Sequence, residues 1–251
     1  MEGRSFGYDG PCDGEVVFST AMVGYPESLT DPSYSGQILC VTYPLIGNYG
    51  IPPMEVDAAG ICKTFESEKI HVRGLIISDY SEKYSHWDAV KSLGEWLQEQ
   101  KIPGICGIDT RALTQMLREE GSMLGRIVPE GAEDDGPIPD PNLENQVAVV
   151  SCREVIRYGS GAKKVVLVDC GVKHQILRCL VERGVEVIRV PWDYDFNRLE
   201  WDGLFISNGP GNPALCGVTV EHIRKALQGD KPVCGICMGN QLLSIAAGAT
   251  T

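Results

Sequence analysis

The last part of the sequence alternates short, continuously apolar runs with helix-like segments, and this pattern constrains the fold more than any other feature. Such runs are typical of strands buried on both faces, and intervening helices favour parallel strands joined by crossovers. We therefore expect a doubly wound parallel sheet whose ligands bind beyond the carboxyl ends of the strands. The predicted strands are 163–169, 185–191, 202–211 (ending in a loop) and 231–236, and the predicted helices are 174–184, 219–229 and 239–248.

The first half of the chain mixes strand-like runs with two amphipathic helices, which predicts an α+β domain. The strand-like runs occupy 14–24, 36–44 and 72–81. A helix predicted over 86–100 would bury one apolar stripe, and a second over 109–122 would bury another. Asp109 or Thr110 would cap the start of the second helix, and Gly121 suits its end. The first stripe consists of Trp87, Val90, Leu93, Trp96 and Leu97, and the second of Leu113, Met116 and Leu117.

An acidic stretch rich in proline and glycine, 128–146, separates the two halves and is typical of an exposed connection. A short strand-like piece at 147–159 leads from it into the second half. We therefore predict a first domain over 1–150, a linker over 151–162 and a second domain over 163–251.

The composition limits the partners and the compartment. A formal net charge of −12 argues against nucleic acid or an anionic membrane as the main partner, because both require a basic face. No apolar run is long enough to span a membrane, and the N-terminus lacks the basic and apolar regions of a signal peptide. We therefore expect an intracellular protein.

The ten cysteines are scattered, mostly in apolar segments, and most are predicted to be buried thiols in a reducing compartment. Cys234 and Cys237 form the only close pair. No second pair of this spacing and no histidine pair follows them, so we predict no metal site.

Cys237 lies between the last apolar strand and the last predicted helix, where it could be a nucleophile, half of a redox pair with Cys234, or a buried thiol. The start of a helix favours a thiolate over a thiol. Its free N–H groups, that of Met238 first, can also face the oxyanion of a tetrahedral intermediate. Gly235 and Gly239 flank the turn and permit a strained backbone and the close approach of a substrate.

A second glycine-rich loop, 207–213, follows the preceding predicted strand. By itself, a Gly-Pro-Gly sequence indicates only a turn. Two such loops at the carboxyl ends of neighbouring strands can donate backbone N–H groups to one crevice, which favours the catalytic interpretation of Cys237.

The sequences "GPGNP" and "PVCGICMGNQLL" resemble the class I, triad-type glutamine amidotransferases, in which the cysteine attacks the side-chain amide of glutamine. "GEVVFSTAMVGYPESLTDPSYSGQIL", "TYPLIGNYG" and "GIDTRALTQMLRE" are similar to the N-terminal domain of the carbamoyl-phosphate synthetase small chain, and "VDCGVKHQILRCLVERG" to the start of its glutaminase domain. The resemblance implies an α/β protein. Its N-terminal α+β domain would be of the small-chain type, followed by an incomplete doubly wound parallel-sheet class I glutaminase domain.

The resemblance also implies roles for individual residues. Cys237 would be the nucleophile, with the N–H groups of Met238 and Gly209 around the oxyanion. The residues that would hold L-glutamine are Ser33, Gly209, Gly211 and Gln241. The implied partner is a carbamoyl-phosphate synthetase large chain, or fused synthetase domains, that uses ATP, bicarbonate and magnesium. No cofactor is expected in this chain itself.

Acyl transfer from glutamine also needs a general base. The family supplies a histidine and a glutamate from a segment well after the cysteine, whereas all four histidines here precede Cys237. We therefore expect a chain that is truncated at its C-terminus, short at its beginning, and unable to turn over glutamine alone. The four are His71, His86 (expected at a helix start), His174 and His222 (expected on a solvated helix face).

Two other functions stay open at this point. The chain could be a non-catalytic docking module for the synthetase. It could also exchange disulfides through Cys234 and Cys237, although Cys234 is expected inside an apolar strand rather than exposed. The resemblance leaves both the pyrimidine and the arginine or urea branch open, and with them cytoplasm or mitochondrion. The ammonia-dependent synthetase of the family lacks the cysteine, so Cys237 favours glutamine use.

Overall fold

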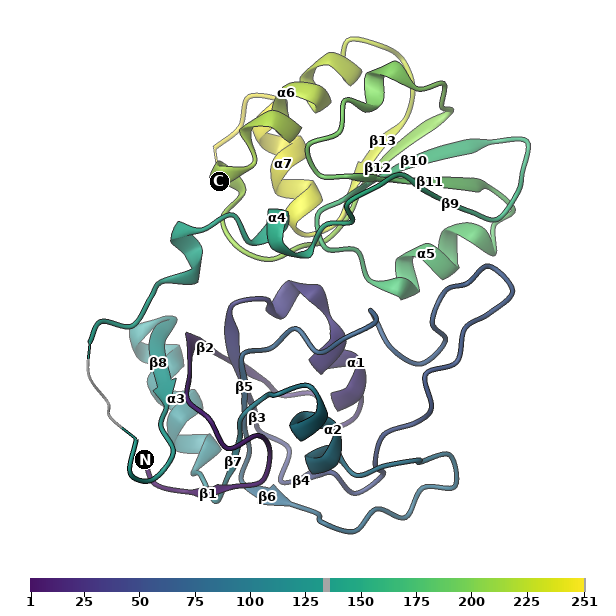
Figure 1. Ribbon diagram of the computed structural model, residues 1–251. Coiled ribbons are helices and arrows are strands. Elements are labelled where there is room, and N and C mark those ends of the chain that lie inside the picture. Colours follow the sequence, from purple (N-terminus) through teal and green to yellow (C-terminus); the bar gives the residue numbers. More distant parts are fainter. Residues whose placement is uncertain (133–135, 251) are drawn as a thin grey trace. The chain divides into compact units, whose positions relative to one another are not determined.

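The computed structural model describes residues 1–132 and 136–250, which form two compact units (Figure 1). Unit 1 comprises Met1–Thr30, Tyr34–Met54 and Glu68–Pro141, and unit 2 comprises Asp31–Ser33, Glu55–Ser67 and Asn142–Thr251. Two short segments of the first half of the chain thus pack with the second half. The predicted domain limits at residues 150 and 163 stay predictions, and residues 133–135 of the acidic connection lie outside the described residues.

Unit 1 is built on a mixed sheet. Its strands are β1 (Arg4–Ser5), β2 (Cys12–Ser19), β3 (Gln37–Val41), β5 (Gly74–Ile76), β7 (Gly104–Cys106) and β8 (Met123–Ile127). They lie in the order β1-β7-β5-β3-β2-β8, and the four inner strands are parallel while each edge strand is antiparallel to its neighbour. The predicted strand-like runs are therefore confirmed as sheet strands. Strands β4 (Leu45–Ile46) and β6 (Asp79–Tyr80) form a separate parallel pair.

The helices of unit 1 are shorter than their sequence patterns. They are α1 (Tyr25–Thr30), α2 (Leu93–Glu99) and α3 (Thr110–Glu120). The 3-10 turns η1 (Pro32–Tyr34) and η2 (Pro141–Leu143) each contain residues of both units. Helix α3 begins after Asp109, whose carboxylate accepts the Ala112 N–H at 2.9 Å, and ends at Gly121 as predicted. Leu113 and Leu117 are buried against the sheet. Met116 is 46% exposed, so its place in the buried stripe was wrong.

The helix predicted over 86–100 begins only at Leu93, which corrects the expectation. Ser92 and Glu95 form a capping box in which Ser92 Oγ accepts the Glu95 N–H at 3.2 Å and the Glu95 carboxylate accepts the Ser92 N–H at 2.8 Å. This reciprocal cap fixes the helix start, so the preceding residues lie outside the helix. Trp87 is consequently 88% exposed and Val90 56% exposed.

Unit 2 contains the predicted doubly wound sheet. Its strands are β9 (Ile156–Tyr158), β10 (Lys164–Asp169), β11 (Glu186–Pro191), β12 (Gly203–Ile206) and β13 (Val233–Gly235). They lie in the order β13-β12-β10-β11-β9, and all pairs are parallel except β11 with β9. The chain leaves β10 for β11 on one side and then builds β12 and β13 on the other, which confirms the fold class.

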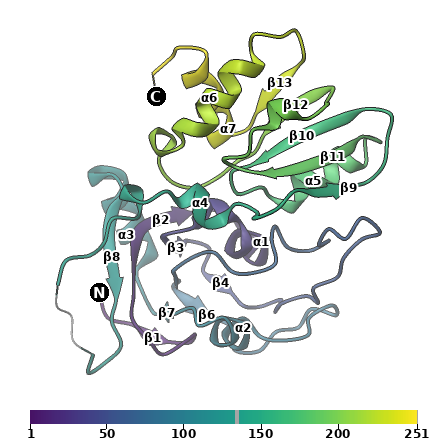
Figure 2. The ribbon, with the colours of Figure 1, turned by 45° about the horizontal axis from the view of Figure 1, so that its top comes forward.

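Helices cover both faces of this sheet (Figures 1 and 2). They are α4 (Gln146–Val150), α5 (His174–Val181), α6 (Gly217–Ala226) and α7 (Met238–Ala246), with 3-10 turns η3 (Phe196–Arg198) and η4 (Pro213–Leu215). Val166 and Val168 of β10 pack in the core cluster that contains residues of α6 and α7, whereas Leu167 packs in the cluster of α5. This alternation assigns the two helix layers to opposite faces. The strand-like piece predicted at 147–159 is partly helical, because α4 occupies its first residues.

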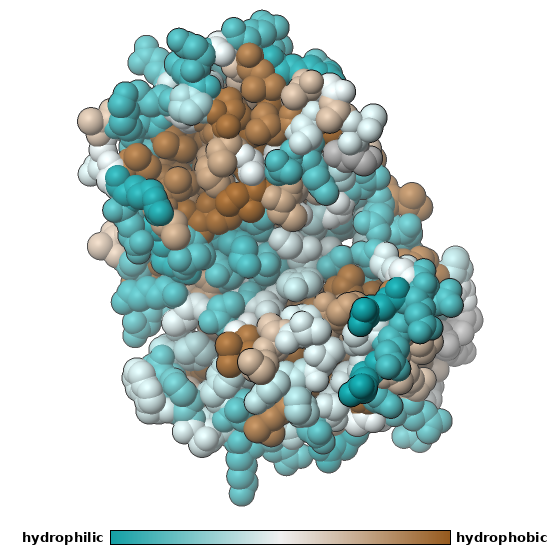
Figure 3. All heavy atoms as spheres, turned by 180° about the vertical axis from the view of Figure 1, so that it is seen from behind, coloured by the Kyte–Doolittle hydropathy of each residue, from teal (hydrophilic) through white to brown (hydrophobic). Residues whose placement is uncertain are grey.

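Strand β13 lies at an edge of the sheet, and this position determines the surroundings of Cys234. Cys234 is paired in register with Phe205, on the face opposite to the buried Leu204 and Ile206. Phe205 is half-buried and Cys234 is exposed. Figure 3 shows hydrophobic side chains gathered on one face of the molecule, over unit 2.

No helix in residues 1–132 and 136–250 is long and apolar enough to cross a membrane.

Candidate active site

Cys237 occupies a strained turn between β13 and α7. Its backbone dihedrals are φ 52° and ψ −113°, and it is the N-cap residue of α7. Of the described non-glycine residues, only Lys101 shares a positive φ. A cysteine held in this sparsely populated region at a strand-to-helix turn has the geometry of a nucleophile elbow. Its side chain is exposed.

The two glycines that flank Cys237 are required by close backbone contacts. A Cβ atom added to Gly235 would lie 2.4 Å from the carbonyl oxygen of Gly239, and one added to Gly239 would lie 2.1 Å from that of Ile206. Real Cβ atoms do not approach carbonyl oxygens this closely. The sharp turn around Cys237 therefore depends on the absence of side chains at both positions.

Backbone hydrogen bonds attach the Cys237 turn to the carboxyl end of β12. Ile236 N–H donates to Ile206 O at 3.0 Å, and Gly239 N–H donates to Ser207 O at 3.0 Å. The glycine-rich loop 207–213 starts at this contact, and a Cβ atom on Gly209 would lie 2.0 Å from Cys170 O. The predicted meeting of the two glycine-rich turns at neighbouring strand ends is confirmed.

Ser33 joins this loop although it is distant in sequence. The side-chain amide of Asn208, 3% exposed, donates to Ser33 Oγ at 2.8 Å, and its oxygen accepts the Lys173 N–H at 3.2 Å. Asp31 supports the segment, because its carboxylate accepts the Ser33 N–H at 2.9 Å and lies 2.9 Å from Lys173 Nζ. Unit 2 therefore holds the Ser33 segment by hydrogen bonds and an ion pair.

A buried polar network lies under the same loops. The Asp169 carboxylate, fully buried at the end of β10, accepts the N–H groups of Gly171 and Val172 at 2.9 and 2.8 Å. Its other oxygen accepts from Arg189 Nε at 2.8 Å and the Cys152 N–H at 2.8 Å. Burial alone would lower the pKa of Arg189, but Asp169 and the Tyr158 hydroxyl outweigh it and raise that pKa.

The structure brings five of the six predicted site residues to these adjoining loops and places the sixth one helical turn further on. Gln241 is exposed on α7, where its N–H donates to Cys237 O at 3.0 Å. Sequence reasoning missed Asn208 and Asp169. Asp169 is the last residue of β10 and Asn208 is the second residue after β12, and polar side chains at the carboxyl ends of buried strands commonly face a site, so that signal could have found them. The five predicted site residues that lie at the adjoining loops are Ser33, Gly209, Gly211, Cys237 and Met238.

The other cysteines are less exposed than Cys234 and Cys237. Cys12, Cys40, Cys62, Cys106, Cys170 and Cys216 are buried. Burial raises the pKa of Cys216 to about 11 and that of Cys152 to about 12, so these two thiols remain protonated and unreactive at neutral pH. Cys234 and Cys237 are exposed. The placement of Cys234 in a strand is confirmed, but its expected burial was wrong because β13 is an edge strand.

The two histidines of unit 2 are engaged away from the Cys237 turn. His174 is buried at the start of α5, 3% exposed. The His222 side chain is only 14% exposed, lies 3.5 Å from the Asp195 carboxylate and packs edge-on against Phe196. The expectation of a solvated His222 was therefore wrong, because its helix turns it towards η3. His86 lies in a turn beside Trp87 and not at a helix start.

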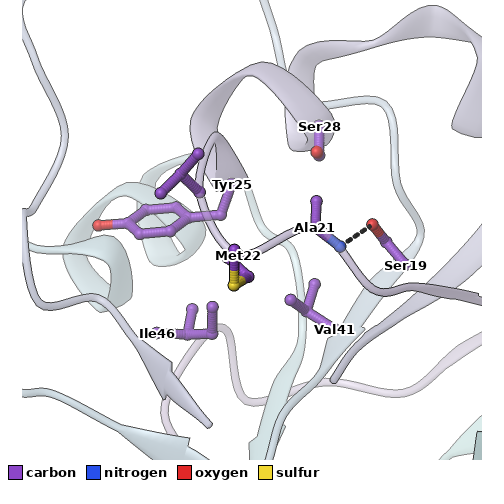
Figure 4. A pocket seen from close by; sticks show the side chains of 8 residues that line it. Ser19, Ala21, Met22, Tyr25, Ser28, Val41 and Ile46 are labelled. Atoms are coloured by element: carbon purple, nitrogen blue, oxygen red, sulfur yellow. Dashed lines mark hydrogen bonds between the residues drawn. The ribbon is translucent and has the colours of Figure 1, made fainter. Parts of the chain in front are cut away.

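A pocket in unit 1 is too small for a substrate. It is lined by Ser19, Ala21, Met22, Val23, Tyr25, Ser28, Val41 and Ile46 (Figure 4). Its volume of about 10 Å³ holds roughly one water molecule. Burial raises the pKa of Tyr25, whose hydroxyl donates to Gly50 O at 2.7 Å.

Within the described residues, no group of three or more His, Cys, Asp or Glu side chains could hold a metal ion.

Two protein families match the sequence. The carbamoyl-phosphate synthase small chain, CPSase domain, matches residues 1–127, and the class-I glutamine amidotransferase family matches residues 166–251. The first match alone covers more than half of the chain. The two matches correspond to the two parts that the sequence patterns distinguish.

Individual relatives match over the whole chain. It is 51% identical over 255 residues to the multifunctional protein CAD of Squalus acanthias, covering 100% of this chain and 11% of that protein. It is 50% identical over 255 residues to the mitochondrial carbamoyl-phosphate synthase (ammonia) of Homo sapiens, covering 100% and 17%. It is 48% identical over 264 residues to the carbamoyl phosphate synthase arginine-specific small chain of Saccharomyces cerevisiae, covering 100% and 64%. The chain thus spans between 11% and 64% of the length of these relatives.

Proposed function

Because the chain belongs to the carbamoyl-phosphate synthase small-chain family, we propose that it forms the glutamine-hydrolysing part of a carbamoyl-phosphate synthase. The observation that carries this proposal is the exposed Cys237 on its left-handed turn at the start of α7. A structural cysteine gains nothing from a strained, solvent-facing position, whereas a nucleophile requires one.

In the proposed reaction, the Cys237 thiolate attacks the side-chain amide carbon of L-glutamine, and the electron pair of the carbonyl moves to its oxygen. The first N–H groups of a helix have no intrahelical acceptor, so the N–H of Met238 is available to this oxyanion together with that of Gly209. Collapse of the intermediate breaks the carbon–nitrogen bond, and the leaving nitrogen takes up the proton that the Cys237 thiol gave to the general base, so that it departs as ammonia. Water then cleaves the thioester to give glutamate and the free thiol.

Binding of glutamine is assigned to the loops around the turn. Ser33 and the N–H groups of Gly209 and Gly211 would contact the substrate from the glycine-rich side, and Gln241 would contact it from α7. Backbone donors suit the carbonyl and carboxylate oxygens of glutamine. Proton transfer to the leaving nitrogen is assigned to neither His174 nor His222, because His174 is buried at the start of α5 and His222 lies against Asp195 and Phe196.

The partner follows from the same proposal. Ammonia released at Cys237 would be consumed by a synthetase large chain, or by fused synthetase domains, that joins it to bicarbonate with ATP and magnesium. This chain would itself bind no cofactor. Similarity to relatives named for a multifunctional protein and for arginine-specific synthesis supports both a fused and a separate synthetase.

The test is replacement of the nucleophile in the intact protein with its synthetase. The substitution Cys237→Ala should lower glutamine-dependent ammonia release by at least about 10³-fold, because removal of a nucleophile abolishes the covalent route. Carbamoyl phosphate formation from added ammonium chloride should not change. Undiminished glutamine use by Cys237→Ala would refute the proposal.

A second function is favoured by one relative. The human protein that is 50% identical over the whole chain carries ammonia in its name, so this fold also occurs in a synthase named for a different nitrogen source. In that case the chain would dock to the synthetase without hydrolysing glutamine. Wild-type protein that makes carbamoyl phosphate from ammonium chloride but not from glutamine would identify this function.

A further inference from the structure

We infer that Asn208 is a positioning residue that directs the hydroxyl proton of Ser33 towards an acceptor oxygen of the substrate; this inference rests on the proposed function. Asn208 is the second residue of the glycine-rich loop 207–213 that follows β12, and its side-chain amide contacts both Ser33 and Lys173. The hydrogen bond to Ser33 joins Asn208 to a residue 175 positions earlier in the sequence.

The orientation of the Asn208 amide follows from its backbone partner. A side-chain amide has one accepting and one donating end, and the two ends look alike unless the partners distinguish them. The Lys173 backbone N–H, 3.2 Å away, can only donate, so the amide oxygen must face it. The NH₂ group therefore faces Ser33 Oγ at 2.8 Å.

This orientation determines what Ser33 can do. A hydroxyl group that accepts from an amide NH₂ keeps its own proton for another acceptor. Within residues 1–132 and 136–250, the Ser33 hydroxyl donates to no group. Ser33 is half-buried beside the loop that contains Gly209, so an acceptor oxygen of a bound substrate can receive this proton.

The amide is also prevented from turning over. Asn208 is 3% exposed, and a flipped amide would place its NH₂ group against the Lys173 N–H in a buried position. The backbone on the other side is held by Ser207, whose hydroxyl accepts the Cys170 N–H at 2.9 Å and donates to Asn208 O at 2.8 Å. Main chain and side chain of Asn208 are thus both fixed before substrate binds.

The substitution Asn208→Asp separates this role from a merely structural one. The introduced carboxylate has nearly the same shape and can still accept the Lys173 N–H. Its second oxygen can only accept, however, so the Ser33 hydroxyl would turn and donate to it. The substrate then loses its donor, while the loop keeps its packing.

The loop offers a matched control in Asn212. The Asn212 side chain only accepts, from the Ala214 N–H at 2.9 Å, and the residue is exposed. The substitution Asn212→Asp therefore adds the same charge within the same loop without reversing a hydrogen bond.

The experiment measures KM for glutamine and kcat for ammonia release in the intact protein. We expect Asn208→Asp to raise KM about 10- to 100-fold, the effect of losing a hydrogen bond to a charged or polar substrate oxygen, with kcat changed less than about threefold. Asn212→Asp should match wild type. The double variant Ser33→Ala, Asn208→Asp should have a KM within about threefold of that of Ser33→Ala, because Asn208 acts through Ser33.

The remaining outcomes contradict either the role of Asn208 or the proposed hydrolysis of glutamine. An unchanged KM in Asn208→Asp, a loss confined to kcat, or multiplication of the two single effects in the double variant would overturn the role of Asn208. Wild-type protein without glutamine hydrolysis, or with hydrolysis that survives Cys237→Ala, would instead overturn the proposed function.

Discussion

Each of the two units contains one prominent carboxylate–guanidinium pair, and the two pairs lie in very different surroundings. In unit 2, Arg189 contacts Asp169 at 2.6 and 2.8 Å, and their side chains are 10% and 0% exposed. In unit 1, Arg126 contacts Asp13 at 2.5 and 3.0 Å, and their side chains are 14% and 27% exposed. Similar bonds are therefore made at different depths.

The two pairs differ in the parts of the backbone that each carboxylate stabilises. Asp13 and Arg126 are directly opposite each other on β2 and β8, so their pair supports the pairing of two antiparallel strands. Asp169 also accepts three backbone N–H groups, two of which belong to the turn after β10. That turn contacts the loop of Gly209. The buried pair thus shapes the candidate site, whereas the partly exposed pair supports the β2–β8 edge of the unit 1 sheet and the backbone at Gly136 and Pro137.

The largest effect is expected for Asp169→Ala. Loss of this carboxylate leaves Arg189 buried without its counter-ion and the three N–H groups without their acceptor, which should lower the free energy of unfolding of unit 2 by about 3–5 kcal/mol. Hydrogen exchange of peptides from β10 and β11, measured by mass spectrometry, reports this unit. Asp13→Ala is the matched change in unit 1 and should cost about 1 kcal/mol. Equal effects of the two substitutions would contradict the distinction.

A smaller but still large effect is expected for Gly239→Ala, which tests the backbone of the site. The added methyl group would lie 2.1 Å from Ile206 O, so the Cys237 turn must shift at a cost of roughly 3 kcal/mol. The rate of Cys237 alkylation by iodoacetamide should change as well, because the turn is displaced. Gly217→Ala is the control, since a Cβ atom there meets nothing within 4 Å. Its stability should be unchanged, or higher by up to about 1 kcal/mol.

The smallest effect concerns pH and the pair in unit 1. The hydrogen bond from Arg126 lowers the pKa of Asp13. A carboxylate with a lowered pKa in the folded state stabilises the protein above its unfolded-state pKa of about 3.9, and this contribution is lost as the pH falls through the folded-state pKa. Wild type should therefore exceed Asp13→Asn in stability by about 1 kcal/mol above roughly pH 5, with the difference shrinking below roughly pH 4. Denaturant unfolding at several pH values measures it, and a difference that grows in acid would refute this interpretation.

The second half of the chain was predictable because its local signals agree with one another. Apolar runs, helical periodicity and glycine-rich turns all indicated the same strands and helices, and the structure confirms them. The prediction that a helix begins at residue 86 was wrong. Trp87 and Val90 have the apolar spacing of a helix, but they precede the cap at Ser92, where the helix starts. There a local hydrogen-bonded cap outweighed periodicity, and Ser92 followed by Glu95 was the available signal.

The candidate site was predictable only in part. The Cys237 turn is local, since strand, glycines and helix follow each other within a few residues. Asn208 and Asp169 act through partners that sequence spacing does not reveal, namely Ser33 and Arg189. Their residue types are ordinary at or just after the end of a strand, so only the assembled sheet shows which groups they bind.

The interleaving of the two units bears on how the chain is synthesised. The Glu66 carboxylate accepts the Gln175 N–H from a residue 109 positions later. At about 5–20 residues per second, the ribosome needs roughly 5–20 s to pass from one to the other. During that time the segment around Glu66 has been synthesised, but helix α5, on which it will pack, has not. Unit 2 therefore cannot be completed as a single continuous piece of nascent chain, and its early segments wait for their partners.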